Sequence, residues 1–376
     1  MVPSPPRALS CSEKLDWLRL SRSENVGPIT FYRLLEHFGS AEAALRSLPE
    51  MARRGGRGKP ISVATKALVQ RETEELEALG GRFIAQCEPD YPPPLAVLED
   101  APPLLAVRGH PSLLTRPMVA IVGARNASLN GRKIARQIAA ELGQTGIVVV
   151  SGLARGIDAA AHEGSLATGT VAVNAGGVDV LYPPENGGLF EQIVAGGALV
   201  SEMPLHEHPQ ARHFPRRNRI VSGMALGVLV VEAATRSGSL ITARLATEQG
   251  REVFAVPGSP LDPRSEGPHR LLRDGAVLVE RADDILRELE HMLRQPLGES
   301  RDRSHIRPVE TTGVEERLLE QARKILLEAL GTTPVTVDEI IRECQLSPPV
   351  VSQVLLEMEL AGRVDRHPGN QVSLAV

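Results

Sequence analysis

Arginine side chains gather between His208 and Val231, in the segment HPQARHFPRRNRIVSGMALGVLVV. The segment holds four arginines and no acidic residue, although the whole chain carries 42 Lys and Arg against 46 Asp and Glu. A guanidinium group presents a planar fork of N–H donors that matches the oxygens of a phosphate. The cluster therefore indicates a local positive field, suited to a phosphate-bearing ligand larger than one nucleotide. Its members are Arg212, Arg216, Arg217 and Arg219.

Three loops that contain glycine each lie between an apolar strand pattern and a helical pattern. They cover residues 123–126, 151–158 and 237–239. In open parallel sheets, such loops gather at the carboxyl edge of the strands, where ligands bind. Glycine lets the backbone approach a ligand, and the start of the following helix offers N–H donors. Arg125 in the first loop adds a full charge, so we expect a phosphate site at this edge.

Structural roles remain open for the residues near these loops. A glycine before a helix is often only a turn, and Asp158 at a helix start suits a cap better than a catalytic acid. His162 is expected to be a packed histidine rather than a base. Some of the arginines have a structural alternative, which is pairing with Glu202 or Glu232.

The central part of the chain predicts alternating strands and helices. Its continuous apolar runs are typical of strands buried on both faces of a parallel sheet. Helical patterns between them cover residues 131–143, 156–169 and 239–250. We therefore expect a doubly wound, Rossmann-like α/β domain over residues 91–295. Its expected strands are residues 118–123, 146–152, 170–177, 198–202, 227–233, 252–256 and 276–279.

Smaller modules are expected on either side of this domain. Residues 1–90 place apolar side chains at helical spacing, similar to a sterile-alpha-motif or helix-hairpin-helix module. Residues 296–313 are polar and irregular, which predicts a linker. Residues 314–376 predict three helices and then a β-hairpin that turns at residues 368–370, which is the order of a small winged helix.

Composition places the chain among soluble globular proteins. Of its 376 residues, 42% are hydrophobic and 23% are charged. The sequence contains no apolar run long enough to span a membrane, and its N-terminus lacks the apolar core of a secretion signal. The three cysteines are far apart and predict neither a disulfide nor a zinc site, so a reduced cytoplasm is expected.

Motifs of several enzyme classes are absent from the sequence. There is no GxxxxGK[ST] phosphate loop, and the first glycine turn, GARNASLNG, does not match GxGxxG. No Ser/His/Asp order, HExxH or paired-carboxylate pattern stands out. The sequence therefore resembles a nucleotide-binding fold that lacks recognisable catalytic parts.

Seven motifs in the central domain resemble the DNA-processing protein A (DprA/Smf) family. In order, they are VAIVGARNASLNG, SGLARGIDAAAH, LYPPEN, VSEMP, FPRRNRIVSG, VVEAATRSGSLITARLA and GREVFAVPGSP. The flanking modules also resemble the three-domain members. Two departures concern residues 174–177, where Asn-Ala-Gly-Gly replaces an aliphatic-Gly-x-Gly turn, and His269, which stands where the family has Asn.

The resemblance implies a cytoplasmic bacterial protein that binds and protects incoming single-stranded DNA during natural transformation. It further implies that the protein loads the RecA recombinase onto that strand and forms a homodimer through the Rossmann-like domain. Neither a metal nor a nucleotide cofactor is expected, and no catalytic residue is assigned.

We expect the strand to lie across the carboxyl edge of the sheet. Phosphate contacts dominate such binding and carry no sequence information, so binding should be sequence-tolerant and sensitive to salt. Phe214 is expected either to stack on a base or to be buried. The expected DNA-binding residues are Gly123, Arg125, Ser151, Gly152, Arg155, Gly156, Phe214, Arg216, Arg217, Asn218, Arg219, Ser237, Gly238 and Ser239.

The C-terminal segment has the wrong charge for a duplex-DNA reader. Residues 314–376 carry 6 basic and 10 acidic side chains. The expected recognition helix, SPPVVSQVLLEMELAG, has no Lys or Arg and contains Glu357 and Glu359. Phosphates repel acidic helices, so we expect protein contact or regulation here and no large loss of single-strand affinity when this segment is deleted.

Two other functions remain open at this point. The central domain is also similar to nucleotide phosphoribohydrolases of the "lonely guy" type, for which Glu232 is the candidate acid. Four arginines exceed the need of one monophosphate, which disfavours that alternative. A scaffold that binds only other proteins would leave the arginine cluster unexplained.

Overall fold

The computed structural model describes residues 7–294, 316–367 and 369–375. The expected linker, residues 296–313, and Pro368 of the expected hairpin turn lie outside these ranges. The described chain forms two compact units. The smaller unit takes residues from both ends of the chain, and the larger unit lies within residues 72–301 and omits the short stretch 99–104. The boundaries expected near residues 90, 295 and 313 stay predictions.

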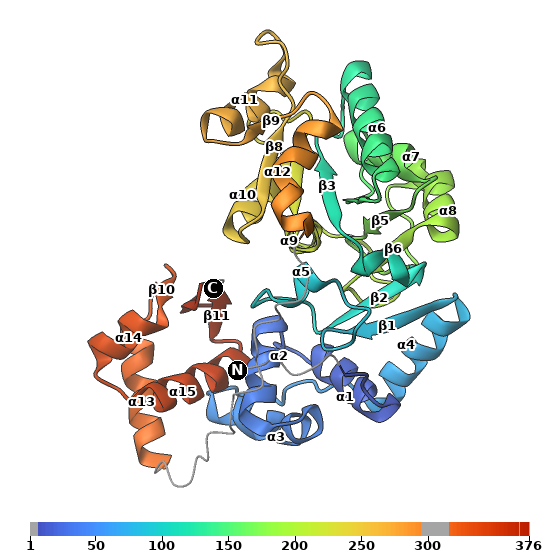
Figure 1. Cartoon of the computed structure of the whole chain (residues 1–376). Helices are drawn as coiled ribbons and strands as arrows, with labels where there is room; N and C mark the ends of the chain where they lie inside the picture. Colours follow the sequence, from blue (N-terminus) through green and yellow to red (C-terminus); the bar gives the residue numbers. More distant parts are fainter. Residues whose placement is uncertain (1–6, 295–315, 368, 376) are drawn as a thin grey trace. The chain divides into compact units, whose positions relative to one another are not determined.

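A nine-stranded sheet forms the centre of the larger unit, in the order β1-β2-β6-β5-β4-β3-β7-β8-β9 (Figure 1). From β6 to β9 the neighbouring strands are parallel, and β2 joins β6 in the antiparallel sense, with Ala106 opposite Ser201. The predicted Rossmann-like sheet is therefore confirmed, and β1 and β2 extend it beyond the strands that the sequence analysis expects. The strands are β1 (Gly81–Ala85), β2 (Leu104–Gly109), β3 (Met118–Val122), β4 (Val148–Ser151), β5 (Thr170–Val173), β6 (Ala198–Ser201), β7 (Gly227–Val230), β8 (Glu252–Ala255) and β9 (Val277–Leu278).

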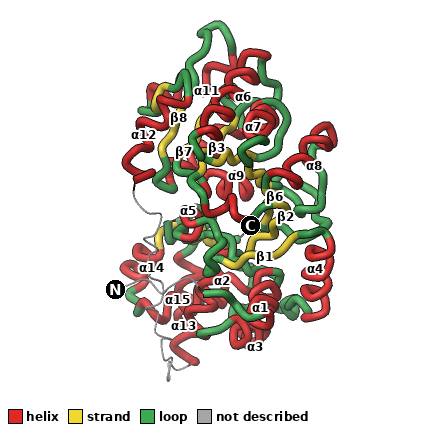
Figure 2. Tube along the Cα trace, turned by 45° about the vertical axis from the view of Figure 1, so that its right-hand side comes forward, coloured by secondary structure: helices red, strands yellow, loops and turns green. Residues whose placement is uncertain are grey.

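Helices cover both faces of this sheet, as the red helices around the yellow strands in Figure 2 show. Alternate strand residues point to opposite faces. Val148 and Val150 of β4 therefore pack in one core with α9 and α10, and Val149 packs in another with α6, α7 and α12. The α-helices are α4 (Lys66–Ala78), α5 (Pro93–Ala96), α6 (Leu129–Gln144), α7 (Ile157–Ser165), α8 (Gly187–Gly196), α9 (His213–Met224), α10 (Gly238–Glu248), α11 (Glu266–Arg273) and α12 (Ala282–Arg294), and the 3-10 helices are η1 (Pro111–Thr115), η2 (Pro184–Asn186) and η3 (Pro263–Ser265).

Serine side chains set the start of two of these helices. Ser128 Oγ accepts a hydrogen bond from Gly131 N at the start of α6, at 2.9 Å. Ser237 occupies the equivalent position before α10 and accepts from Ser239 N at 3.4 Å. Such caps satisfy backbone donors that have no partner inside the helix, and they fix where the loops after β3 and β7 end.

The smaller unit contains helices from both ends of the chain. Leu356 and Leu360 of the last helix pack in one apolar core with Phe31 and Leu48. The C-terminal part has the predicted order of three helices and a hairpin, completed by a short additional strand. Its elements are α1 (Cys11–Ser21), α2 (Pro28–Phe38), α3 (Ala41–Arg54), α13 (Glu316–Ala329), β10 (Val335–Thr336), α14 (Val337–Cys344), α15 (Pro348–Leu360), β11 (Val364–His367) and β12 (Gln371–Leu374).

Two buried ion pairs hold α15 within this unit. Glu357 lies 2.6 Å from Arg323, and Glu359 lies 2.6 Å from Arg366. Both glutamate side chains are at most 3% exposed. The acidic charge of α15 therefore does not face solvent, which corrects the argument that exposed glutamates would repel a duplex from this helix. Among the described residues, no helix is both long and apolar enough to cross a membrane.

Candidate functional site

The chain order of the sheet reverses at β3, which has β4 on one side and β7 on the other. Ligands of doubly wound folds bind beside such a reversal, outside the carboxyl ends of the strands. In this protein a side chain of the protein itself occupies this position between β3 and β7. The carboxylate of Glu232, just after β7, accepts hydrogen bonds from both the backbone N and the Oγ of Ser128 at the start of α6.

The Glu232 carboxylate also explains a glycine in α6. A Cβ atom on Gly131 would lie 2.5 Å from the carboxyl carbon of Glu232, so a side chain there would collide with it. An internal anion thus occupies the helix start at which the sequence analysis expects free N–H donors, which is a correction to that expectation. The Glu232 carboxylate is hydrogen-bonded to Ser128 at the start of α6, and this position does not support a role as a catalytic acid.

The open site lies one strand further along the same edge. A pocket of about 240 Å³ is bordered by the loops that follow β3, β4 and β5, by the segment before η2, and by the first turn of α9. Its lining residues are Arg125, Gly152, Leu153, Ala154, Arg155, Asn174, Ala175, Tyr182, Pro183, Pro184, Glu185, Phe214 and Arg217.

The α9 helix divides the FPRRNR segment between two faces. Residues three apart share one side of a helix, and neighbouring residues do not. Phe214 and Arg217 therefore point together into the pocket. Arg216 and Arg219 point together toward Glu202, which lies 3.6 Å from Arg216 and is also paired with Arg219.

Arg217 is a buried cation at the base of the pocket. Its guanidinium lies 3.9 Å from the Asp158 carboxylate, and both side chains are at most 7% exposed. Its Nε atom has no hydrogen-bond partner among the described residues. Burial lowers the pKa of Arg217, Asp158 opposes this effect, and Arg125 adds to it. Arg217 therefore combines a full charge with unused hydrogen-bonding capacity.

Gly152 makes room for that guanidinium. A Cβ atom at this position would lie 1.2 Å from Nη1 of Arg217. Only a residue without a side chain lets Arg217 lie against the loop that follows β4. A glycine is expected there from the sequence for backbone approach to a ligand, whereas the structure shows close approach to an arginine of the same chain.

Asp158, in the first turn of α7, fixes the loop on the other side. Its carboxylate accepts a hydrogen bond from Ala154 N at 3.4 Å. Burial raises the pKa of Asp158, and Arg217 and the backbone donors of the loop oppose that shift. The interaction agrees with the expected capping role and gives no sign of a catalytic acid.

Aromatic rings form one wall of the pocket. The Arg125 guanidinium lies 5.0 Å from the centre of the Phe214 ring, and Arg217 lies 5.9 Å from it on the same ring. Tyr182 lies 5.9 Å from Phe214, tilted by 54°. Arg125 is exposed and forms no ion pair with any described residue. A planar base and its phosphate would find a ring and a cation side by side here.

Five of the expected site residues line this pocket: Arg125, Gly152, Arg155, Phe214 and Arg217. The structure does not bring Arg216 and Arg219 to it. Ser151 is fully buried and donates to Ile121 O at 2.6 Å, so its hydroxyl serves the sheet.

The remaining expected residues lie outside this pocket. Asn218 Nδ2 donates to Gly238 O at 3.4 Å, which connects α9 to the start of α10. The hydroxyls of Ser237 and Ser239 bond to each other at 2.7 Å. A Cβ on Gly123 would meet Ile157 at 2.6 Å, so this glycine serves close packing. The last one, Gly156, lines a neighbouring pocket.

Sequence reasoning missed Tyr182, although the LYPPEN motif contains it. It also missed α9 as a helix, and with it the separation of Phe214 and Arg217 from the other arginines. The only hint in the sequence is that the residues of the 214/217 and 216/219 pairs are three positions apart, as on one face of a helix. His269, the departure from the family pattern, bonds to the backbone of Gly258 through its Nε2, at 3.0 Å to the oxygen.

His162 is buried behind this site, as expected of a packed histidine. Its Nδ1 lies 2.8 Å from Thr170 Oγ1, and that hydroxyl donates to Val149 O. His162 Nδ1 is therefore the donor. Burial, and secondarily Arg217, lower the pKa of His162 to about 3. The ring is neutral at physiological pH.

Known protein families match this chain over nearly its full length. Residues 82–290 match the family described as DNA recombination-mediator protein A. Residues 11–75 match a DprA-like N-terminal HHH domain, and residues 311–370 match a DprA winged helix domain.

Curated relatives give the same picture. Protein Smf of Synechocystis sp. is 34% identical and the alignment covers 95% of this chain and 98% of the relative. Protein Smf of Escherichia coli is 42% identical, over 76% of this chain and 75% of the relative. The DNA processing protein DprA of Streptococcus pneumoniae is 46% identical, over 53% and 71%.

Two solved structures are similar as well. The X-ray structure of DNA processing protein A from Streptococcus pneumoniae has a TM-score of 0.64 at 35% identity and covers 75% of this chain and 99% of that one. A structure of DNA processing protein A from Helicobacter pylori, described for its single-stranded DNA binding mode, has a TM-score of 0.52 at 28% identity, over 56% and 96%.

Proposed function

The chain belongs to the DNA recombination-mediator protein A family, and from this premise we propose that it binds single-stranded DNA at the pocket of Arg125, Phe214 and Arg217. One observation carries the proposal. An exposed arginine and a buried arginine lie on the same aromatic ring and line one pocket, at the carboxyl edge of a parallel sheet. The Helicobacter pylori relative, described for its single-stranded DNA binding mode, supports the choice of ligand.

In the proposed complex, Arg125 binds a backbone phosphate and a base lies against Phe214 and Tyr182. Every base has a π-face, so stacking tolerates any sequence. Arg217, which also lines the pocket, binds a second polar group of the nucleotide through its guanidinium group. A duplex hides its base faces in the stack, so the aromatic wall favours an unpaired strand.

We extend the proposal to the role that the family resemblance implies. The protein protects incoming single strands during natural transformation and loads the RecA recombinase onto them, as a homodimer formed through the Rossmann-like domain. It acts in the cytoplasm, without a metal or a nucleotide cofactor, and as a binding protein rather than an enzyme.

Filter binding with single-stranded and double-stranded DNA of equal length tests the binding proposal. We expect preference for the single strand and a logarithmic affinity that falls linearly with the logarithm of salt. Equal affinity for both forms would contradict the proposed site. Incubation with nucleoside monophosphates is the companion assay, since release of free base would favour the phosphoribohydrolase alternative.

RecA loading needs its own measurement. RecA-catalysed strand exchange on DNA already covered by a single-strand-binding protein is expected to start sooner when this protein is added. The Arg125→Ala variant is the matched control, because it should lose the effect if loading depends on strand binding. No acceleration by the native protein would remove the loading role and leave the binding role intact.

A further inference from the structure

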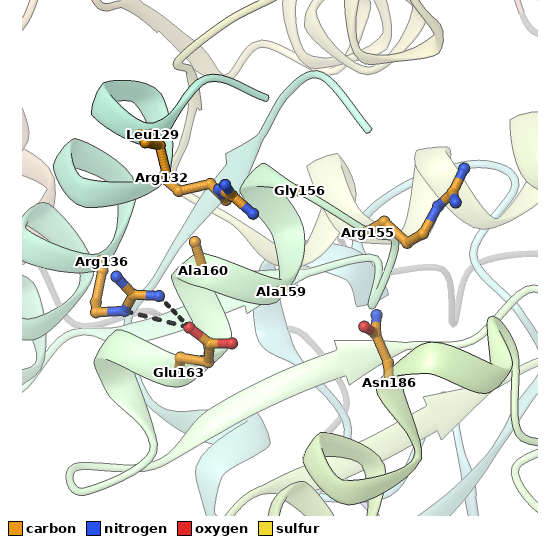
Figure 3. A pocket seen from close by; sticks show the side chains of 9 residues that line it. All are labelled: Leu129, Arg132, Arg136, Arg155, Gly156, Ala159, Ala160, Glu163 and Asn186. Carbon is orange, nitrogen blue, oxygen red and sulfur yellow. Dashed lines mark hydrogen bonds and ion pairs between the residues drawn. The ribbon is translucent and has the colours of Figure 1, made fainter. Parts of the chain in front are cut away.

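A second pocket lies on the other side of the loop that follows β4. It measures about 350 Å³ and is formed by the N-terminal half of α6, by α7 and the two residues before it, and by Asn186 (Figure 3). Its lining residues are Leu129, Arg132, Arg136, Arg155, Gly156, Ala159, Ala160, Glu163 and Asn186.

Positive charge dominates this second pocket. Three arginines line it, against the single carboxylate of Glu163, which is paired with Arg136. Arg132 is exposed and forms no ion pair with any described residue. In Figure 3, Arg136 and Glu163 lie together at one end, and Arg132 extends over the centre. An excess of cationic charge therefore remains for an anion from outside.

The floor of the pocket consists of small residues. Gly156, Ala159 and Ala160 leave the space that larger side chains would fill. Gly156 has φ of +80°, and a Cβ there would lie 2.2 Å from Ala124 O. The described lining holds no aromatic ring on which a base could stack, so it suits a phosphate rather than a base.

The two pockets share one wall. Arg155 lines both of them and is paired at 3.3 Å with Glu185, which lines the first. Asn186 of the second pocket donates to Leu153 O of the first at 2.9 Å. Both residues of the Arg155–Glu185 pair are about half exposed, at 52% and 56%, so the pair is open to exchange with a ligand phosphate.

We propose that the second pocket is a phosphate subsite for the same strand. A bound strand continues from the first pocket across Arg155 and places a further backbone phosphate between Arg132 and Arg155. The shared wall favours a polymer over a separate small anion, because one backbone can reach both cavities. The inference rests on the proposed function and extends it to the path of the strand.

Oligothymidylates of increasing length test this path. We expect Arg132→Ala to leave the affinity for the shortest bound oligomers unchanged and to reduce the affinity for the longest oligomers about five- to tenfold. The salt slope for the long oligomers should become shallower by about 0.7, the amount expected for one lost phosphate contact with a single strand. The Lys133→Ala variant is the control, because Lys133 is exposed on the same helix and does not line the pocket.

Three results would overturn the subsite. The first is an Arg132→Ala variant with the native affinity for oligomers of every length. The second is a variant whose affinity falls equally at every length. The third is inorganic phosphate that binds the native protein at Arg132 and does not reduce its affinity for long oligomers. Arg125→Ala separates this inference from the proposed function. If that variant weakens all lengths and Arg132→Ala changes none, strand binding stands and the second subsite fails. If the native protein binds no oligomer, the proposed function fails first.

Discussion

Two arginine–carboxylate pairs in this protein are similarly buried but differ in the distance between their charged groups. In the smaller unit, Arg366 and Glu359 are 4% and 3% exposed and 2.6 Å apart. In the larger unit, Arg217 and Asp158 are 7% and 6% exposed and 3.9 Å apart. Burial therefore does not distinguish the two arginines. They differ in the distance to the carboxylate and in the pocket that Arg217 lines.

The remaining partners strengthen this contrast. Arg366 also donates to Asn370 Oδ1 at 3.2 Å, and Glu359 accepts from Thr30 Oγ1 at 3.2 Å. Arg217 keeps an unbonded Nε and borders a cavity. The pair in the smaller unit is complete without a ligand, whereas the Arg217 guanidinium forms no close ion pair and lines a pocket.

Arg366→Ala should have the largest effect on stability. It leaves Glu359 buried without its cation, which typically costs about 3–5 kcal/mol. Urea unfolding of the full chain measures the loss, with Arg342→Ala on the exposed surface of α14 as the control. Single-strand affinity should change little. A stability loss below about 1 kcal/mol would remove the contrast between the two pairs.

Arg217→Ala should chiefly weaken binding. It also removes the cation beside the buried Asp158, but backbone donors of the loop still hold that carboxylate, so we expect a smaller loss of stability than for Arg366→Ala. Hydrogen bonds to charged groups contribute about 1.5–3 kcal/mol, so single-strand affinity should fall roughly 10- to 100-fold. Arg217→Lys should not restore it, because an ammonium lacks the planar fork. Filter binding together with thermal unfolding separates the two effects. Native affinity in a folded Arg217→Ala protein would show that this arginine is structural too.

Arg125→Ala sharpens the comparison at an exposed position. We expect about a tenfold loss of affinity for every sequence tested and a salt slope that is shallower by about 0.7. Thermal stability should be unchanged, since Arg125 forms no ion pair with any described residue. Arg244→Ala is the matched control, because that arginine is exposed on α10 and paired only with Glu248 among the described residues. An unchanged slope would place the phosphate elsewhere.

The smallest expected effect is the change that Arg217→Ala makes to the acid sensitivity of the protein. His162 has a folded pKa of about 3, below its ordinary value of 6.5. Between these values the unfolded chain binds the extra proton, so stability falls as the pH drops from about 6.5 toward 3. Arg217→Ala should narrow this window, because it removes a charge that lowers the pKa of His162. Unfolding free energies measured across that pH range in both proteins test the difference, and identical slopes would contradict it.

The sequence was sufficient for the doubly wound sheet and for five residues of the pocket. Continuous apolar runs identify buried parallel strands, and glycine before a helix marks the edge where ligands bind. The sequence alone did not predict that the FPRRNR segment divides between two faces of a helix. That division depends on α9 being a helix, and the arginine-rich start of α9 lacks the apolar periodicity that identified the others.

Other details depend on contacts between distant segments. Glu232 lies more than a hundred positions from Ser128, which it caps. Glu357 and Glu359 carry negative charge in the sequence, and only the fold reveals that Arg323 and Arg366 neutralise them. A charge count over one helix cannot detect a partner on another element.

The strand β1 at one end of the larger sheet has a practical consequence. It lies beside β2, and β2 lies beside β6. An expression fragment that starts at residue 91 would keep β2 and lose β1, leaving a row of unpaired backbone donors and acceptors along β2. Such an edge is a template for other chains, so we expect the shortened protein to aggregate more readily than a fragment that starts before Gly81, which keeps the edge as the intact chain has it.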